Sequence, residues 1–180
     1  MGKQNPFQLD VVSVRLVRDE PVFSDTKITN PESAIAVVGE ILCEMDREVV
    51  CIINLKSDGT PINCNFASMG AINQAIVEPR EIFKSAVLSN AASMIMVHNH
   101  PSGNLEPSKE DTMITDRILK LASLIGIPLT DHVIVGGDNT RYFSFKEKEL
   151  LKTPKVSLTQ NYHYLEFGQS VMVAERGKCR

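Results

Sequence analysis

Short apolar runs alternate with stretches of helical periodicity along most of this chain, and that alternation limits the fold more than any other feature. Apolar runs bounded by polar or turn-forming residues are typical of strands, and apolar residues that recur every three or four positions are typical of helices. The strand-like runs lie at residues 11–17, 49–55, 62–67, 94–97 and 133–135. The helical stretches lie at residues 31–45, 79–89 and 108–125. This order predicts an α/β (α+β) fold in which helices flank a mixed β-sheet.

A turn-forming cluster follows the last of these runs. Residues 136–139, Gly-Gly-Asp-Asn, predict a tight hairpin that leads into a further strand over residues 141–143. The sequence contains no glycine-rich loop of the kind that cradles phosphates, so we do not expect a nucleotide site.

The 180-residue chain is long enough to fold around a hydrophobic core without covalent help. Its composition is 43% hydrophobic, and a domain of this size buries roughly 70% of the surface that its unfolded chain exposes. The four cysteines, Cys43, Cys51, Cys64 and Cys179, have no C-x-x-C spacing that would indicate a disulfide framework or a structural zinc site. Any bound metal is therefore expected to serve chemistry.

Charge and hydropathy restrict the partners that we expect for the chain. The net charge is −3, although residues 151–180 carry five basic side chains against two acidic ones. Residues 1–150 are therefore acidic overall, which argues against a broad surface that binds nucleic-acid phosphates. No apolar run approaches the roughly 18 residues that a membrane span requires, and the polar start lacks a secretory leader, so we expect a cytoplasmic protein with no membrane partner.

Two of the four histidines occur in one triplet, His98-Asn99-His100, directly after the apolar run at residues 94–97. If the strand continues through the triplet, residues two positions apart point to the same face of the sheet. Pro101 favours this because the residue before a proline is pushed toward extended backbone. Both imidazoles are therefore expected to project together from the end of a strand.

A third candidate ligand follows at the start of the next helix. Ser108 is a natural N-cap, and Asp111 lies in the first turn, which a short loop folds back toward the histidines. By itself, Ser108 with Asp111 is typical of a capping box, and a lone His-x-His pair is more often structural. Together, His98, His100 and Asp111 form a three-ligand set with a fourth position for water, which suits zinc better than iron or manganese.

The complete spacing, H-x-H-x(7)-S-x-x-D, is that of the JAMM (MPN+) metalloproteases. Residues 98–103, His-Asn-His-Pro-Ser-Gly, followed by Pro107, Ser108 and Asp111, resemble the bacterial RadC branch of that superfamily. Further segments match the family in order and spacing, at residues 79–84, 90–92, 129–136 and 144–145. The resemblance covers about residues 27–150 and implies the MPN/JAB (cytidine-deaminase-like) architecture.

The resemblance also implies roles for individual residues. It makes His98, His100 and Asp111 zinc ligands, and it makes Ser108 a helper that holds the attacking water or the developing oxyanion. It further implies a glutamate upstream that acts as general base. We prefer Glu48, which precedes a predicted strand, to the alternatives on the preceding helix, Glu40 and Glu44.

A second pair, Asp131-His132, also matches the family, and its distance in sequence from the other ligands gives no reason to count it among them. We interpret it either as structural or as a pair that supports the site from behind.

The implied function is zinc-dependent hydrolysis of a peptide or isopeptide bond, with an amide of a peptide or protein as substrate. Two alternatives stay open, a DNA-repair-associated accessory protein of a mobile element and a non-catalytic binding module.

We expect residues 1–26 to form a strand that leads into the domain, residues 27–150 to form the RadC-like metal domain, and residues 151–180 to form an extension. That extension is expected to be partly ordered or to contact a second copy in a homodimer.

Overall fold

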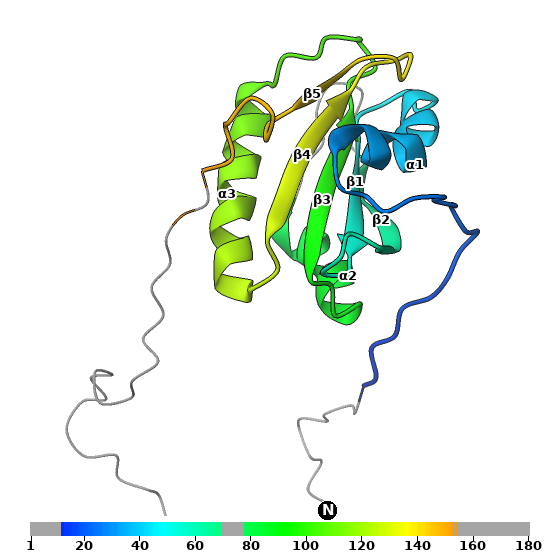
Figure 1. Ribbon diagram of the computed structural model, residues 1–180, viewed down its shortest axis with the longest axis vertical. Coiled ribbons are helices and arrows are strands. Elements are labelled where there is room, and N and C mark those ends of the chain that lie inside the picture. Colours follow the sequence, from blue (N-terminus) through cyan, green and yellow to red (C-terminus); the bar gives the residue numbers. More distant parts are fainter. Residues whose placement is uncertain (1–11, 70–77, 153, 155–180) are drawn as a thin grey trace, which may run out of the picture.

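The computed structural model describes residues 12–69, 78–152 and 154, and in these residues three helices and five strands alternate along the chain (Figure 1). The helices are α1 (Pro31–Cys43), α2 (Pro79–Leu88) and α3 (Lys109–Ile125). The strands are β1 (Val49–Leu55), β2 (Pro61–Met69), β3 (Ser93–Asn99), β4 (Leu129–Val135) and β5 (Tyr142–Ser144). Every helix that the sequence predicts is present, and so is every strand predicted after residue 30.

The five strands form one mixed sheet in the order β2-β1-β3-β4-β5. Neighbouring strands are antiparallel except for β3 and β4, which run parallel and are joined by α3 as a crossover helix. Parallel neighbours need such a crossover, because the chain must return to the end at which the first strand began. The crossover places the start of α3 beside the carboxyl end of β3, which is where the histidine triplet lies.

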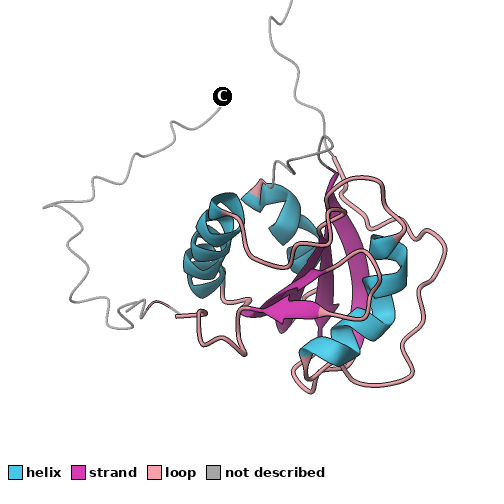
Figure 2. Cartoon of the chain, turned by 90° about the horizontal axis from the view of Figure 1, so that it is seen from above, coloured by secondary structure: helices cyan, strands magenta, loops and turns pink. Residues whose placement is uncertain are grey.

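The sheet lies between two helical layers, with α1 on one face and α2 and α3 on the other (Figure 2). Alternate residues of β1 point to opposite faces, as expected for a strand. Cys51 and Ile53 pack with α1, whereas Val50 and Ile52 pack with α2 and α3. These two clusters are the core of the domain, and together with the mixed sheet they confirm the predicted α+β class.

Local signals in the sequence explain where the helices begin and end. The side chain of Asn30 accepts a hydrogen bond from the Ser33 amide and caps α1, and Ser108 caps α3 in the same way. Helix α3 ends at Ile125 and is followed by Gly126, whose φ of 81° is a left-handed conformation that suits a residue without Cβ. The predicted hairpin at residues 136–139 is also present, because it joins the antiparallel strands β4 and β5.

One predicted strand is wrong. Residues 12–17 form no strand, and Val12, Val14 and Val17 are 77%, 70% and 86% exposed. Alternation of apolar residues stabilises a strand only where a neighbouring strand and a core receive it, and no described strand pairs with this segment. Residues 1–11 of the predicted N-terminal segment and most of the predicted extension, 151–180, lie outside the described residues.

In the part of the chain that the structure describes, no helix combines the length and the apolar character needed to cross a membrane.

Candidate metal centre

The two histidines of the triplet lie side by side at the carboxyl end of β3. Both are buried, His98 at 3% and His100 at 6% exposed. His98 occupies the penultimate position of the strand, and the amide of His100 continues the pairing by donating to the carbonyl of Val135 at 2.9 Å. The strand alternation therefore extends to His100, and the two Nε2 atoms are only 2.9 Å apart.

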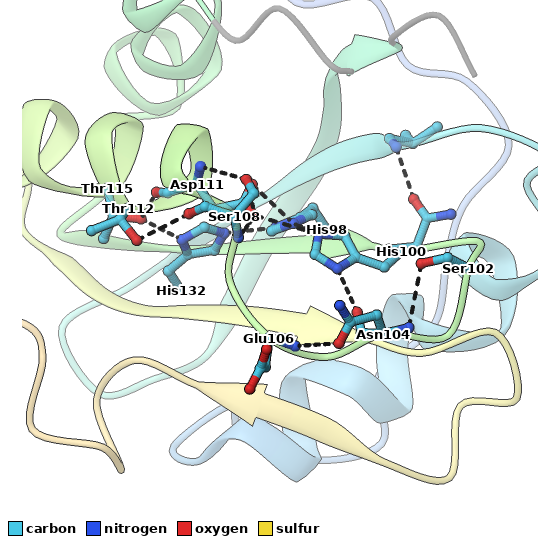
Figure 3. Close-up of polar contacts among 12 residues, drawn as sticks. His98, His100, Ser102, Asn104, Glu106, Ser108, Asp111, Thr112, Thr115 and His132 are labelled. Carbon is cyan, nitrogen blue, oxygen red and sulfur yellow. Dashed lines mark hydrogen bonds and ion pairs between the residues drawn. The ribbon is translucent and has the colours of Figure 1, made fainter. Parts of the chain in front are cut away.

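Asp111 reaches the same point from the first turn of α3 (Figure 3). One carboxylate oxygen, Oδ1, lies 3.3 Å from Nε2 of His98, and the other, Oδ2, lies 3.4 Å from Nε2 of His100. One ligand atom from each residue lies within 4.8 Å of the other two. The structure thus brings together the three residues that the sequence singles out as metal ligands.

Ser108 and Asp111 form a capping box as well as contributing to this group. The Ser108 amide and hydroxyl both donate to Oδ2 of Asp111, at 2.7 and 2.6 Å, and the Asp111 amide donates to the Ser108 hydroxyl at 3.0 Å. The box leaves Oδ1 facing His98. The capping interpretation and the ligand interpretation are therefore compatible, because the box fixes the carboxylate that the histidines face.

A chain of hydrogen bonds behind His98 determines which of its ring nitrogens carries the proton. The Thr115 hydroxyl donates its single hydrogen to the Asp111 carbonyl at 2.5 Å, so toward Nδ1 of His132, at 2.6 Å, it acts as an acceptor. His132 is then protonated on Nδ1, and its Nε2 accepts from Nδ1 of His98 at 2.7 Å. His98 consequently directs the lone pair of Nε2 toward Asp111.

His100 is oriented in the same way by the loop that follows it. Its Nδ1 lies 2.6 Å from the backbone carbonyl of Asn104, and because a carbonyl only accepts, Nδ1 must carry a hydrogen. The neutral ring therefore also presents the lone pair of Nε2 to the shared point. A backbone carbonyl or carboxylate behind a metal-ligating histidine is the usual arrangement in metal sites.

Three electron-pair donors that face one point repel each other unless a positive charge lies between them. Burial lowers the pKa of His98 to about 4, whereas the contacts of His100 with Asp111 and the Asn104 carbonyl outweigh burial and raise the pKa of His100. Burial opposes ionisation of Asp111, but its contacts with His100, His98 and Ser108 together lower its pKa. Of the two rings, His100 therefore holds a proton more readily, and Asp111 favours its carboxylate form.

A divalent metal fits this donor set better than a proton does. Zinc ligands at about 2.0–2.2 Å in a tetrahedron lie about 3.3–3.6 Å from each other. The two distances from imidazole nitrogen to carboxylate oxygen, 3.3 and 3.4 Å, are within that range, and the nitrogen-to-nitrogen distance of 2.9 Å is somewhat shorter. His98, His100 and Asp111 are therefore the described residues suited to hold zinc.

Glu48 lies on the same side of the sheet as the histidines. It directly precedes β1, and by strand alternation it shares a face with Val50, which pairs with His98 in the β1–β3 register. Glu48 is half-buried, and its negative charge is among the influences that raise the pKa of His100. The alternatives Glu40 and Glu44 are exposed and belong to α1 and its C-cap, and α1 packs on the opposite face.

Asn99, the middle residue of the triplet, holds the backbone on both sides of Glu48. Its Oδ1 accepts from the Val49 amide at 2.8 Å, and its Nδ2 donates to the Arg47 carbonyl at 3.0 Å. Asn99 is only 1% exposed. The triplet therefore supplies two candidate ligands on one face of the sheet, and Asn99 holds the neighbouring strand in place.

Sequence reasoning missed Asn99, Asn104 and Thr115 and left His132 undecided. His132 supports His98 from behind, whereas its neighbour Asp131 points to the other face and accepts hydrogen bonds from the Ser144 hydroxyl and the Lys146 amide. One signal for Thr115 was present, because it lies four positions after Asp111 and so shares a helix face with it.

The fold and the site together define an α+β domain of the JAB type with a His-His-Asp group at the carboxyl end of a central strand. A family model described as the RadC-like JAB domain matches residues 28–150. The chain belongs to this RadC-like JAB domain family.

Relatives among curated proteins agree with that assignment. A UPF0758 protein of Clostridium beijerinckii is 39% identical over 128 residues, which are 71% of this chain and 55% of the relative. A UPF0758 protein of Clostridium tetani is 43% identical over 124 residues (69% and 54%), and one of Methanosarcina acetivorans is 38% identical over 126 residues (70% and 54%). The chain thus spans about half the length of these relatives.

Proposed function

We propose that this chain is a zinc-dependent hydrolase that cleaves a peptide or isopeptide bond. The observation that carries the proposal is the convergence of the Nε2 lone pairs of His98 and His100 with the Asp111 carboxylate on one point. Two neutral imidazoles and one carboxylate are ligands that zinc prefers, and three protein ligands leave a fourth position for water or substrate. A bound zinc ion supplies a water molecule that ionises near neutral pH and a charge that polarises a carbonyl group.

Glu48 is the general base in this proposal. Its carboxylate accepts one proton from the attacking water, whose oxygen bonds to the carbonyl carbon of the substrate. The same carboxylate returns that proton to the amide nitrogen as the carbon–nitrogen bond breaks, so the products are a carboxylic acid and an amine. Its place on the histidine side of the sheet, beside His100, supports this role.

Ser108 donates a hydrogen bond to the oxygen that becomes negative when the water adds. Its hydroxyl lies 2.6 Å from Oδ2 of Asp111, and it exchanges that acceptor for the substrate oxygen as charge develops there. The Ser108 amide keeps its own bond to Oδ2 at 2.7 Å, so the Asp111 carboxylate remains oriented when the hydroxyl turns away.

The test combines a metal assay with an activity assay on the purified chain. Zinc content is measured by elemental analysis, and hydrolysis is measured on a library of fluorescence-quenched peptides and lysine isopeptides. We expect about one zinc per chain, loss of zinc in His98→Ala, and retained zinc with lost turnover in Glu48→Gln. The matched control Glu44→Gln, an exposed glutamate at the end of α1, should keep both zinc and turnover.

Several outcomes would contradict the proposal. A purified chain that retains no zinc would favour the non-catalytic binding module, and an active Glu48→Gln variant would remove Glu48 from the mechanism.

DNA association is tested separately by a mobility shift with duplex DNA across a range of salt concentrations, and self-association in a homodimer by sedimentation. Fractionation of cells tests the proposed cytoplasmic location.

A further inference from the structure

Behind the candidate ligands, one threonine connects the helix that carries Asp111 to the strand that carries His98. The Thr115 hydroxyl contacts the Asp111 carbonyl at 2.5 Å and Nδ1 of His132 at 2.6 Å, and Nε2 of His132 contacts Nδ1 of His98 at 2.7 Å (Figure 3). This chain of contacts runs from α3 through β4 to β3. It therefore links two proposed ligands on the side away from the metal position.

We propose that Thr115 and His132 are positioning residues that keep the Nε2 lone pair of His98 directed at the metal position. The inference deepens the proposed function and rests on it. The same hydrogens can be placed along this chain of contacts in two arrangements. Only one of them leaves Nε2 of His98 able to bind a metal.

In the first arrangement, Thr115 donates to the Asp111 carbonyl, and His132 and His98 each carry their hydrogen on Nδ1. Nε2 of His98 is then a free ligand atom. In the second arrangement, Thr115 donates to Nδ1 of His132, and His132 donates from Nε2 to Nδ1 of His98. The hydrogen of His98 then lies on Nε2, directed at Asp111, and it occupies the metal position.

The Asp111 carbonyl favours the first arrangement. It lies 2.5 Å from the Thr115 hydroxyl and can only accept, so the first arrangement keeps a short hydrogen bond that the second one loses. Thr115, at 3%, and His132, at 1% exposed, are too deeply buried for bulk water to replace the lost donor. The Asp111 carbonyl keeps its helical partner, the Thr115 amide, in both arrangements, so losing the hydroxyl costs the net value of one hydrogen bond, about 0.5–1.5 kcal/mol.

Packing keeps the His132 ring in the orientation that this chain requires. Phe145 stacks on it with ring centroids 4.6 Å apart and an interplanar angle of 5°, and the Phe145 amide donates to the His132 carbonyl at 3.0 Å. Phe145 is itself 2% exposed. A ring enclosed in this way keeps Nδ1 on Thr115 and Nε2 on His98.

A purely local role for Thr115 makes a different prediction. A threonine within a helix often donates to the carbonyl four residues earlier, and Thr112 makes the same kind of bond to the Ser108 carbonyl at 3.1 Å, at an exposed position of the same helix. If Thr115 only stabilises the helix, then Thr115→Val and Thr112→Val should both leave zinc affinity unchanged.

The experiment compares Thr115→Val with Thr115→Ser, which keeps the hydroxyl, and with Thr112→Val. Zinc affinity is measured by competition with a chromophoric chelator. The protonated nitrogen of each histidine is identified in the metal-free protein by ¹⁵N imidazole NMR. We expect Thr115→Val to weaken zinc binding by about 10- to 100-fold, the usual effect of losing a support behind a ligand, and to move hydrogen from Nδ1 to Nε2 of His98 in part of the molecules.

The two controls should stay within about threefold of the wild type, a margin small against the 10- to 100-fold effect. Unchanged zinc affinity in a folded Thr115→Val variant would overturn the inference. If that variant does not fold, the wild-type spectrum still decides, because a hydrogen on Nε2 of His132 would overturn the inference and a hydrogen on Nδ1 would support it. A wild-type chain that binds no zinc but shows the predicted hydrogens would instead contradict the proposed function.

Discussion

Replacing Asn99 with alanine should destabilise the domain markedly, although Asn99 contributes no ligand to the candidate metal centre. Its side chain is 1% exposed and makes one hydrogen bond to the Val49 amide at 2.8 Å and another to the Arg47 carbonyl at 3.0 Å. In Asn99→Ala both backbone groups lose their partner. The two groups differ in their access to water, and that difference sets the size of the effect.

The Val49 amide belongs to a residue that is 1% exposed, so its unsatisfied hydrogen costs about 1–3 kcal/mol. Arg47 is exposed, and its carbonyl regains a water molecule, so the loss there is only the net value of a hydrogen bond, about 0.5–1.5 kcal/mol. Together the free energy of unfolding should fall by about 1.5–4.5 kcal/mol, before any contribution from the small cavity.

Urea unfolding of the metal-free protein, followed by circular dichroism, measures this difference without a contribution from bound metal. Asn99→Asp separates hydrogen bonding from volume, because it keeps the acceptor for Val49 and replaces the donor to Arg47 with an oxygen. The control is Asn104→Ala, which removes an exposed side chain and its solvent-accessible hydrogen bond from the Glu106 amide but keeps the backbone carbonyl that His100 uses. The control should change the free energy of unfolding by no more than about 0.5 kcal/mol.

A free energy of unfolding for Asn99→Ala within about 0.5 kcal/mol of the wild type, the range of an ordinary surface substitution, would contradict this prediction. Wild-type stability of Asn99→Asp would contradict part of it, because the bond to Arg47 would then contribute nothing. In a folded Asn99→Asp variant we further expect retained zinc with reduced kcat and little change in KM, because the clamp holds the backbone beside Glu48 rather than the ligands.

Three further outcomes follow from the same geometry. Zinc at 100 times its dissociation constant should stabilise the fold by about 2.7 kcal/mol, seen as a rise in Tm that a chelator reverses; an unchanged Tm would argue against binding to the folded state. The pKa of His100 is raised, so a proton on this ring competes with the metal. Zinc affinity should therefore increase as pH rises through that pKa, and calorimetry in buffers of different ionisation enthalpy can measure the protons released. An increase in zinc affinity as pH falls would contradict this expectation. Gly39→Ala would place a Cβ 2.0 Å from Oδ1 of Asn139. The free energy of unfolding, measured with urea, should therefore fall by about 1–3 kcal/mol. An unchanged free energy of unfolding would mean that the Asn139 side chain moves aside freely.

The elements that the sequence predicted well are those whose signals are local. Strand β1 is apolar at every position except Asn54, because the sheet is covered on both faces, and α3 has a cap, an apolar stripe and a glycine directly after its last residue. The alternating segment at residues 11–17 has an equally clear local pattern, yet residues 12–17 form no strand, because pairing depends on a neighbour that a sequence pattern does not reveal.

The site divides in the same way. The spacing of His98, His100 and Asp111 is short enough for strand alternation and a helix cap to predict their convergence. His132 lies 34 residues after His98 and 17 after Thr115, so their contacts depend on the parallel pairing of β3 with β4. Asn99 lies within the triplet itself, but its role depends on the register with β1, which only the folded sheet defines.

The central claim is tested most directly by X-ray diffraction from zinc-loaded crystals at energies on either side of the zinc absorption edge. The account predicts one anomalous peak about 2.0–2.2 Å from Nε2 of His98, Nε2 of His100 and the Asp111 carboxylate. A peak at another place, such as the cysteines of β1 and β2, or no peak at full zinc loading, would contradict it.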